Sequence, residues 1–355
     1  MAANDSVGED ILGQDCPQIT KGTWETFMVF SYWCGGVLLS IIATLGVIGN
    51  VIAAFVLARK RMRNNFNYLL LALASFDMIF LVISMEDKAV FMQFGIGAKS
   101  YTRFLIYTFF LRPLYWISLT GSMLMIIAIT FERFRAVHYH KSLNPKWPLL
   151  IVAALSVALN VPTFFEKTLV SNNGTLVVAN ALPEHHLATY FTVMNWFNTI
   201  ITIAIPFLVL TILNVRVYMD IRSIKMAVAR YSRSTTAREQ NKEAHLAMIM
   251  MSYVAVFLIC NFPRLICNIY EVVNISFMMR CEGLLPMWIR YMYAIMDLML
   301  VINSSVNIMI YTSMSKEFRR ELRALFDPCC AKHPSNSPST VEDTTGHRPG
   351  TTTLL

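Results

Sequence analysis

Seven long apolar runs dominate this sequence and restrict the folds that it can adopt. They cover roughly residues 29–58, 66–86, 103–136, 147–165, 189–219, 246–273 and 287–312. A helix of about 20 apolar residues is long enough to cross the hydrocarbon core of a bilayer. Only 15% of the residues are charged, against about a quarter in soluble proteins. We therefore predict an all-α membrane protein built as a seven-transmembrane-helix bundle.

Basic residues between the runs predict the side of the membrane on which each end of the chain lies. Arg59, Lys60, Arg61 and Arg63 follow the first run, and further basic clusters lie between runs five and six and after run seven. Because cytoplasmic loops carry the excess of Lys and Arg, we expect a multi-pass plasma-membrane protein with its N-terminus outside. These loops also account for the net charge of +8, so nucleic-acid binding is not expected.

The chain divides into four expected segments. Residues 1–28 form an extracellular tail, 29–314 the bundle, 315–326 a short amphipathic eighth helix, and 327–355 a cytoplasmic tail rich in Ser, Thr and Pro. Such a composition is typical of disorder. Phosphorylation of this tail would recruit a regulatory partner, and an inert tail is the alternative. The final Thr353-Leu354-Leu355 resembles the ligand of a scaffold domain that captures C-termini.

Covalent modifications are predicted on both sides of the membrane. Cys16 and Cys281 lie on the expected outer side, where they either form a disulfide or remain two free thiols, because sequence alone does not fix connectivity. A basic stretch precedes a Cys pair after run seven, which is typical of palmitoylation. The predicted palmitoylation sites are Cys329 and Cys330, and the predicted N-glycosylation sites are Asn4, Asn173 and Asn274.

Strongly polar residues inside the apolar runs mark candidate functional sites, since polar groups are costly at membrane depth. The lone carboxylate of Asp77 in run two requires a cation, a proton or several hydrogen-bond donors. Other runs carry further groups of this kind. They are Asn50, Ser122, Glu132, Arg133, Asn303, Ser304, Asn307 and Tyr311.

These polar motifs resemble, in order and position, those of the rhodopsin-like G-protein-coupled receptors. The matching motifs, between Gly49 and Phe318, are Gly49-Asn50-Val51, Leu73-Ala74 with Asp77, Glu132-Arg133-Phe134, and Asn303-Ser304-Ser305 with Asn307 and Tyr311. The resemblance implies a receptor that activates a heterotrimeric G protein and also contacts arrestin and membrane lipid. It does not imply an enzyme, and the sequence has no nucleophile elbow or phosphate loop.

The resemblance also implies an internal ion site. Its residues would be Asp77, Ser122, Asn303, Ser304 and Asn307, which offer the hard oxygen ligands that suit a sodium ion. Such a receptor requires no cofactor, and sodium would act on it as an allosteric ion. The alternative is a hydrogen-bonded cluster that holds no ion.

A second implied site is a switch at the cytoplasmic end. Arg133 would pair both with Glu132 and with Glu243, which lies twenty residues before Pro263 in helix six. An outward motion of helix six would release Glu243, so the pair provides the two-state element that a switch requires. The remaining switch positions are Asn261, Asn307 and Tyr311.

Several residues typical of the resembled family are missing. Thr108 stands where helix three usually has its disulfide cysteine, and residues 167–188 contain no cysteine either. The second outer loop must therefore be held in another way. Asn261 replaces a tryptophan of helix six, and Ile308 replaces a proline of helix seven. Tyr115 replaces the aspartate that binds amine ligands, and run seven has no lysine for retinal.

Charged and aromatic residues gather at the outer ends of the runs and suit a peptide ligand. Asp297 is the candidate partner of a ligand cation, and an internal pair with Arg264 or Arg112 is the alternative. The predicted ligand-binding residues are Glu86, Asp87, Tyr115, Glu166, Arg264, Glu271, Tyr293 and Asp297.

A further resemblance is to invertebrate FMRFamide-type neuropeptide receptors. The residues that carry it are Asn160-Val161-Pro162-Thr163-Phe164-Phe165-Glu166, Pro263-Arg264 and Asn268-Ile269-Tyr270-Glu271. It implies an amidated peptide ending in Arg-Phe, whose arginine would meet Glu166, Glu271 or Asp297.

Two other functions remain open at this point. One is a chemosensory receptor for a polar small molecule. The other is a seven-helix transporter or channel, in which Asp77 and Asp297 would line the pathway. The pairing expected for Arg133 with Glu243 and the lack of internal repeats favour a receptor over a transporter.

Overall fold

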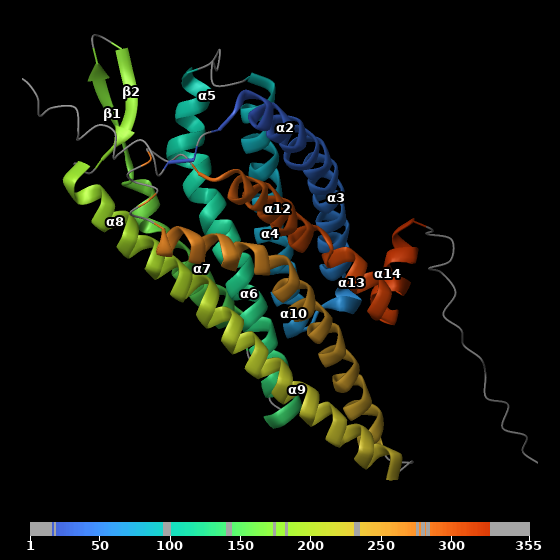
Figure 1. The fold of residues 1–355 in the computed structure, drawn as a ribbon. Helices are drawn as coiled ribbons and strands as arrows, with labels where there is room; N and C mark the ends of the chain where they lie inside the picture. Colours follow the sequence, from blue (N-terminus) through green and yellow to red (C-terminus); the bar gives the residue numbers. More distant parts are fainter. Residues whose placement is uncertain are drawn as a thin grey trace, which may run out of the picture.

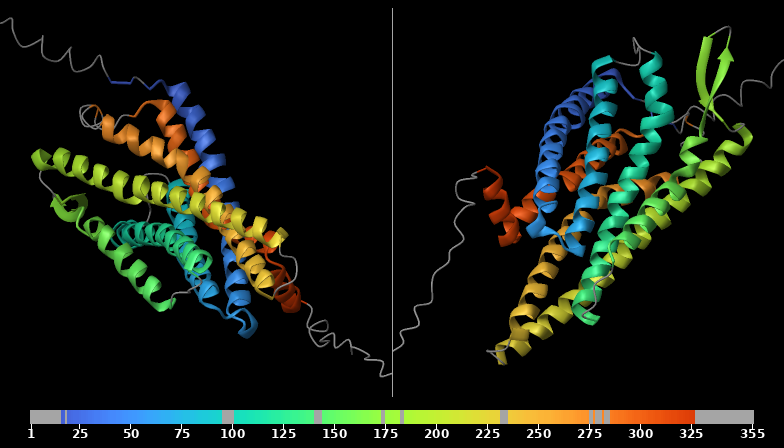
Figure 2. Two further views of the ribbon diagram at one scale, coloured as in Figure 1. Left: turned by 90° about the horizontal axis from the view of Figure 1, so that it is seen from below. Right: turned by 180° about the vertical axis from the view of Figure 1, so that it is seen from behind.

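Long helices form the body of the molecule in the computed structural model (Figure 1). The structure describes residues 16–17, 19–94, 101–139, 144–172, 175–181, 184–230, 235–274, 277, 281 and 285–326. A β-hairpin stands at one end of the bundle, which we call the hairpin end, while the end of α9 and the start of α10 lie at the opposite end (Figure 2).

The elements that position the candidate sites follow one another along the chain. The first half contains α2 (Lys21–Ser31), η1 (Tyr32–Leu38), α3 (Leu39–Leu57), η2 (Lys60–Met62), α4 (Asn65–Phe94), α5 (Tyr101–Ile106), η3 (Tyr107–Leu111), α6 (Arg112–Tyr139), α7 (Lys146–Asn160) and η4 (Val161–Phe164). The second half contains β1 (Lys167–Asn172), β2 (Thr175–Asn180), α8 (Glu184–Phe197), η5 (Asn198–Ala204), α9 (Ile205–Arg230), α10 (Thr235–Val273), α12 (Met287–Ser305), α13 (Asn307–Met314) and α14 (Lys316–Phe326).

The described helices confirm the predicted seven spans. Six of them are long and apolar enough to cross a membrane by themselves, and the pair α12 and α13 provides the seventh, with a bend of 41° between its parts. A helix satisfies all its backbone hydrogen bonds internally, which is why helices suit a bilayer. The six unbroken spans are Lys21–Leu57, Asn65–Glu86, Phe104–Ala136, Lys146–Phe164, Thr192–Asp220 and Val254–Val273.

The first helix begins at Lys21, earlier than the boundary at residue 29 expected from hydropathy. Thr20 caps it, because its side-chain oxygen accepts a hydrogen bond of 3.3 Å from the Thr23 backbone N–H. Phe27 and Phe30 contact the Tyr291 ring of α12, with ring centroids 5.3 and 4.9 Å apart. Polar residues among these aromatic side chains lower the hydropathy of the segment, so hydropathy did not predict the early start of the helix.

Helix seven bends at Val306 although Ile308 occupies the usual proline position. The Ser305 hydroxyl donates to the Val301 carbonyl at 2.7 Å and to the Ile42 carbonyl at 3.2 Å. Serine side chains that bond back to the preceding turn bend helices. Loss of the proline has therefore not removed the bend.

The second outer loop contains a β-hairpin that the sequence reading treated as an unspecified loop. Strands β1 and β2 pair antiparallel, with Lys167 opposite Asn180 and Asn172 opposite Thr175. The hairpin stands beyond the helix ends at the hairpin end of the bundle (Figure 2). Its base, at Glu166, borders the region in which we expected a ligand.

Glycines allow close approaches between helices, as Gly46 and Gly121 show. A Cβ atom at Gly46 would overlap the Ser305 hydroxyl, and one at Gly121 would overlap the Phe76 ring. Small residues at helix interfaces let backbones approach closely, which matters in a bilayer because lipid tails compete for apolar contacts. These contacts join α3 to α12 and α6 to α4, the helices that carry the internal polar residues.

A disulfide joins Cys16 to Cys281, the first of the two alternatives that the sequence left open. It ties the segment before α2 to the connection between α10 and α12. The side chain of Asn274, a predicted glycosylation site, donates to the Tyr270 carbonyl at 2.9 Å. The other predicted modification sites lie outside the described residues, as do the two predicted tails apart from residues 16–17 and 19–28. These sites are Asn4, Asn173, Cys329 and Cys330.

Candidate functional site

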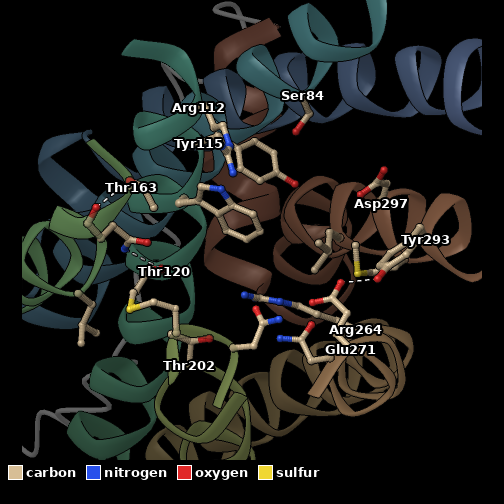
Figure 3. Close-up of a pocket in the computed structure, with 18 of the residues that line it drawn as sticks. Ser84, Arg112, Tyr115, Thr120, Thr163, Thr202, Arg264, Glu271, Tyr293 and Asp297 are labelled. Atoms are coloured by element: carbon tan, nitrogen blue, oxygen red, sulfur yellow. Dashed lines mark hydrogen bonds between the residues drawn. The ribbon is translucent and has the colours of Figure 1, made fainter. Parts of the chain in front are cut away.

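A cavity of about 370 Å³ opens among α4, α6, α8, α10 and α12 near the hairpin end (Figure 3). This volume is in the range of small-molecule and cofactor sites, about 300 to 1,000 Å³. Six of the eight predicted ligand-binding residues line it. They are Tyr115, Glu166, Arg264, Glu271, Tyr293 and Asp297.

The two other predicted ligand residues do not join this cavity. Glu86 is exposed on α4 and is absent from the cavity lining, whereas Ser84 of the same helix lines it. Two residues along a helix correspond to a rotation of about 200°, which turns Glu86 away when Ser84 faces inward. The expectation for Glu86 is corrected accordingly. The side chain of Asp87 lies outside the described residues.

Helical spacing brings the lining residues of each helix onto one face. On α10 the lining positions are Arg264, Asn268 and Glu271, and on α12 they include Tyr293 and Asp297. Residues three or four apart lie above one another on a helix. Arg264 stands among apolar residues in the sequence, yet its side chain lines the same cavity as Asp297.

An ion pair anchors the base of the hairpin to α6. The Arg112 Nη2 atom lies 3.1 Å from the Glu166 Oε2 atom, with 34% and 14% of the two side chains exposed. The Glu166 backbone carbonyl accepts a 3.0 Å hydrogen bond from the Ala181 N–H, which closes the hairpin. Tyr190 of α8 interacts with the same carboxylate. We call Arg112, Glu166 and Tyr190 the hairpin latch.

Lys167 adds a second cation at the latch. Its Nζ atom donates to the Asn180 side chain at 2.7 Å across the first pair of the hairpin. Burial lowers the pKa of Lys167, the nearby Arg112 lowers it further, and Glu166 acts in the opposite direction. Glu166 therefore balances positive charge from both α6 and β1.

On the far side of the cavity, Glu271 and Arg264 form a second polar group. The Tyr293 hydroxyl donates a hydrogen bond to Glu271 Oε1 (Figure 3). Arg264 is only 7% exposed; its guanidinium carbon lies 5.8 Å from the centre of the Trp116 ring and is attracted by Glu271. A buried guanidinium requires such partners, because an isolated buried charge is costly.

The cavity carries an excess of acidic groups. Three carboxylates line it, those of Glu166, Glu271 and Asp297, against the two guanidinium groups of Arg112 and Arg264. Arg112 forms an ion pair with Glu166, and the alternative of an internal pair of Asp297 with Arg264 or Arg112 stays a prediction. Because the lining has one more acid than base, a ligand with a positive charge complements it.

Trp116 adds an aromatic face to the lining. Sequence reasoning did not nominate Asn160 or Thr120 as lining residues. The Asn160 Nδ2 atom donates to the Thr120 hydroxyl at 3.1 Å. Thr120 lies four residues after Trp116 on α6, so helical periodicity was a signal that would have found it.

The predicted internal ion site is a buried polar cluster around Asp77, which is 1% exposed. The Ser122 hydroxyl donates to Asp77 Oδ1 at 2.6 Å, and the Asn307 amide donates to Asp77 Oδ2. Ser304 is buried on the same helix as the half-buried Asn303. The structure thus brings α4, α6 and helix seven together at one carboxylate.

Two oxygens in this cluster bear on the choice between an ion and a purely hydrogen-bonded cluster. Asn50 donates to the Gly46 and Ser304 carbonyls, at 3.0 and 2.9 Å. The Asn50 Oδ1 atom, however, has no hydrogen-bond partner among the described residues, and the Ser304 hydroxyl interacts with the Asp77 carboxylate. Buried polar atoms are rarely left unsatisfied. Together with Asp77 and Ser122 they form an oxygen set that fits a hard cation.

The predicted switch residues lie at the opposite end of the bundle. Glu132 is fully buried, and its Oε1 atom lies 3.4 Å from Arg133 Nη2. The Arg133 guanidinium also lies over the Phe66 ring, 4.2 Å from its centroid. The backbone of Glu243 belongs to α10, but its side chain lies outside the described residues. The Arg133 pairing with Glu243 therefore stays a prediction.

Asn261 and Tyr311, also predicted for the switch, are both buried. The Asn261 amide donates to the Phe257 carbonyl at 2.9 Å, one turn earlier on α10. The Tyr311 ring packs against Phe318 of α14, with ring centroids 5.4 Å apart. Helix seven is thereby joined to α14 by an aromatic contact.

Comparison with known proteins adds independent information. Residues 49–311 match the profile described as 7 transmembrane receptor (rhodopsin family). The chain is 30% identical over 318 residues to the FMRFamide receptor of Drosophila melanogaster, a match that covers 83% of this chain and 54% of the relative, about half its length. It is 24% identical to the FMRFamide peptide receptor frpr-18 of Caenorhabditis elegans, covering 82% of this chain and 69% of the relative. It is also 23% identical to the mouse lysophosphatidic acid receptor 3, covering 82% and 79%.

Proposed function

Because this chain belongs to the rhodopsin family of seven-transmembrane receptors, we propose that it binds an extracellular amidated peptide and activates a heterotrimeric G protein. The peptide ends in Arg-Phe-amide. The family consists of signalling receptors, which agrees with a chain that is not an enzyme. Arrestin and a scaffold domain that captures the C-terminus are further proposed partners.

One observation carries the peptide proposal, namely the acidic excess of a cavity that also has aromatic walls. Glu271 and Asp297 stand on α10 and α12, and Tyr115 and Trp116 stand on α6. A guanidinium group bonds strongly to carboxylates, and an aromatic side chain packs on aromatic walls. The names of two relatives, both receptors for FMRFamide peptides, support the same peptide class.

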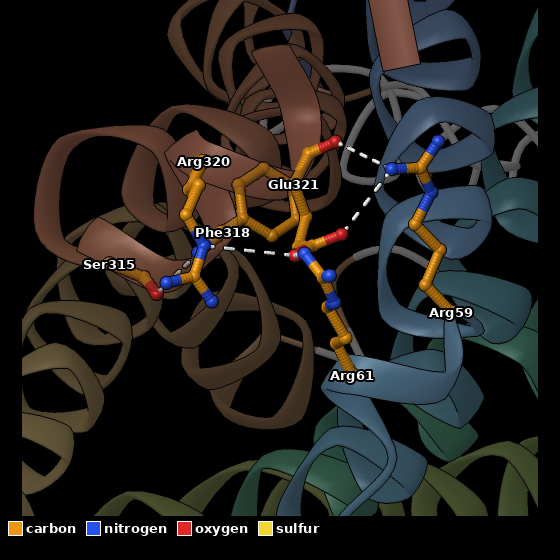
Figure 4. A network of polar contacts seen from close by, with 6 residues as sticks. All are labelled: Arg59, Arg61, Ser315, Phe318, Arg320 and Glu321. Atoms are coloured by element: carbon orange, nitrogen blue, oxygen red, sulfur yellow. Dashed lines mark hydrogen bonds and ion pairs between the residues drawn. The ribbon is translucent and has the colours of Figure 1, made fainter. Parts of the chain in front are cut away.

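We propose that the hairpin end faces the outside of the cell. The disulfide between Cys16 and Cys281 supports this, because disulfides persist in oxidising compartments. α14, which carries several basic residues, lies away from the hairpin (Figure 1), as expected for the cytoplasmic side. Its Glu321 side chain pairs with Arg59 and Arg61, so the basic turn after α3 lies on the same side (Figure 4).

A screen for ligands tests the proposal directly. The chain would be expressed in cells that report calcium and cyclic AMP, and these cells would be exposed to amidated peptides with and without a C-terminal Arg-Phe. We expect responses to the Arg-Phe-amide group. A polar small molecule as the only activator would favour the chemosensory alternative, and a solute-dependent current without any peptide response would favour a transporter.

Asp297→Asn is expected to lower the potency of an Arg-Phe-amide peptide by about tenfold or more, which corresponds to about 1.4 kcal/mol. The neutral amide keeps the shape of the side chain but loses the charge-assisted bond to the ligand arginine. Glu86→Gln is the matched control, because it also removes one acidic charge but lies outside the cavity lining.

The measurement is an agonist concentration response at equal surface expression, repeated with a peptide that has citrulline in place of arginine. We expect citrulline to weaken the response of the wild type and to make no further difference in Asp297→Asn. Equal potency losses for citrulline in both receptors would show that Asp297 does not receive the arginine.

Glu243→Ala is expected to raise signalling in the absence of ligand. We propose that Glu243 holds Arg133 in the inactive state. Helix six, which is part of α10, then swings outward on activation. Basal G-protein activity at matched surface expression is the measurement. Glu239→Ala, one turn away on the same helix, removes the same charge as a control. An unchanged basal level in a well-expressed Glu243→Ala receptor would count against the lock.

A further inference from the structure

The cavity has a neutral polar side opposite its acidic side, which carries Glu271 and Asp297. Figure 3 shows Thr120 on one side of the cavity and Asp297 and Tyr293 on the other. Asn160 of α7 belongs to the neutral side, because its side chain is hydrogen-bonded to Thr120 of α6. Both residues line the cavity, with 7% of Asn160 and 4% of Thr120 exposed. We call Asn160 and Thr120 the neutral pair.

The hydrogen bonds of Asn160 fix which of its atoms is left for a ligand. Its Nδ2 atom donates to the Ser156 carbonyl at 2.8 Å and to the Thr120 hydroxyl at 3.1 Å. A carbonyl only accepts, so the atom next to Ser156 is the amide nitrogen and the other is the oxygen, Oδ1. Among the described residues, no group donates to Oδ1. The neutral pair therefore offers one hydrogen-bond acceptor.

Thr120 supplies a hydrogen-bond donor beside this acceptor. Its oxygen accepts from Asn160, so its own hydrogen points elsewhere. The buried Thr130 of the same helix donates its hydroxyl hydrogen to the Ile126 carbonyl at 2.7 Å. The Thr120 hydroxyl, in contrast, donates to no group in the part of the chain that the structure describes. Buried donors are rarely left without a partner, so this hydrogen is available to a ligand.

A primary carboxamide complements the neutral pair, and a carboxylate does not. The carboxamide has a carbonyl that accepts and an NH2 group that donates, whereas a carboxylate only accepts and would face the Asn160 oxygen. Its buried charge would also lack a counterion, which is costly. The two arginines that line the cavity have other partners, because Arg112 pairs with Glu166 and Arg264 is attracted by Glu271.

We propose that the neutral pair binds the C-terminal carboxamide of the peptide. The Thr120 hydroxyl donates to its carbonyl, and Asn160 Oδ1 accepts from its NH2 group. This role rests on the peptide function proposed above, and it makes the neutral pair the group that selects an amidated terminus. The arginine precedes the terminal residue, so its side chain extends to the acidic side while the chain end reaches the neutral pair. The phenylalanine ring packs on the Tyr115 and Trp116 rings, whose centroids lie 5.2 Å apart.

The test compares three forms of the peptide Phe-Met-Arg-Phe, which end in an amide, a methyl ester or a free acid. The ester keeps the carbonyl but has no N–H donor. Agonist concentration responses would be measured at equal surface expression. For the wild type we expect the ester to be about tenfold weaker than the amide, equivalent to about 1.4 kcal/mol, and the acid to be weaker still. In Asn160→Leu, amide and ester should agree within about twofold, because the acceptor for the NH2 group is gone.

Thr163→Val is the matched control, because it also removes a hydroxyl from the cavity lining. The Thr163 hydroxyl already donates to the Asn160 backbone carbonyl at 2.7 Å, so it has no hydrogen left for a ligand. The amide preference of this variant should stay within about twofold of the wild-type value. Thr120→Val, in contrast, should weaken amide and ester alike by about tenfold, since both contain the carbonyl that Thr120 binds. Asn160 keeps its hydrogen bond to Ser156 in that variant.

The outcomes separate this role from the peptide function itself. Equal potency of amide and ester in the wild type, with a response that citrulline in place of arginine still weakens, would overturn the role of the neutral pair. The peptide function would then stand. An unchanged amide preference in a well-expressed Asn160→Leu receptor would overturn the role as well. No response to any of the three forms would overturn both the role and the Arg-Phe-amide ligand.

Discussion

Reversing either charge of the hairpin latch is expected to abolish most of the peptide response, and reversing both is expected to restore it. In Arg112→Glu, two carboxylates would face each other where the structure has an ion pair of 3.1 Å. In Glu166→Arg, two guanidinium groups would do so. Breaking a half-buried pair costs more than the 0 to about 1 kcal/mol typical of exposed pairs. We expect potency to fall by about tenfold or more in each single variant.

The double variant, Arg112→Glu with Glu166→Arg, separates two roles of Glu166. If Glu166 holds the hairpin, the double variant rebuilds the pair in the opposite sense, and potency should return to within about threefold, or about 0.7 kcal/mol. If Glu166 instead receives the ligand arginine, the substituted arginine would repel that ligand. Surface staining and agonist concentration response measure both outcomes. If the potency of the double variant is no higher than that of the weaker single variant, the latch is contradicted.

The latch also explains how the chain manages without the outer disulfide of its family. Thr108 and the cysteine-free second loop leave no thiol on either side. Glu166 joins α6 to the hairpin through its carboxylate and closes the hairpin through its backbone carbonyl. An ion pair can be broken and re-formed without redox chemistry. The base of the hairpin, at the edge of the cavity, is thus held by an exchangeable contact.

The sequence predicted the internal sites well because polar groups at membrane depth have few alternative explanations. Asp77, Ser122 and Asn307 lie on three different runs, yet each was recognisable as costly in its own run. The structure places all three in one hydrogen-bonded cluster. The cavity residues Arg264, Glu271 and Asp297 were found for the same reason.

Two features of the hairpin end were not predicted, for different reasons. The hairpin itself had a signal: Asn173-Gly174 stands between runs rich in β-branched residues, a pattern typical of a tight turn. No sequence signal indicated the pairing of Arg112 with Glu166. These residues are far apart in the sequence, and the packing of α6 against α7 decides whether they meet. In the structure Arg112 pairs with Glu166, a partner that the sequence did not suggest.

Sodium is expected to stabilise the ligand-free receptor through Asp77, and Asp77→Asn is expected to abolish that effect. We propose that the ion meets the carboxylate and the oxygens of Asn50, Ser122 and Ser304. The Asn50 Oδ1 atom lacks a hydrogen-bond partner among the described residues, and Ser304 interacts with the Asp77 carboxylate itself. An ion that binds only the folded state stabilises it by about 1.4 kcal/mol when its concentration is ten times its Kd. The asparagine keeps the size of the side chain but removes the charge that attracts the ion.

The measurement is the thermal unfolding midpoint of the purified receptor in sodium chloride against choline chloride at the same ionic strength. For the wild type we expect a higher midpoint and a lower agonist affinity in sodium, because ion and agonist then favour different states. For Asp77→Asn the two salts should give the same values. If the wild type also responds equally to both salts, the cluster is held by hydrogen bonds alone. In that case Asp77 acts by joining α4 to Ser122 and Asn307.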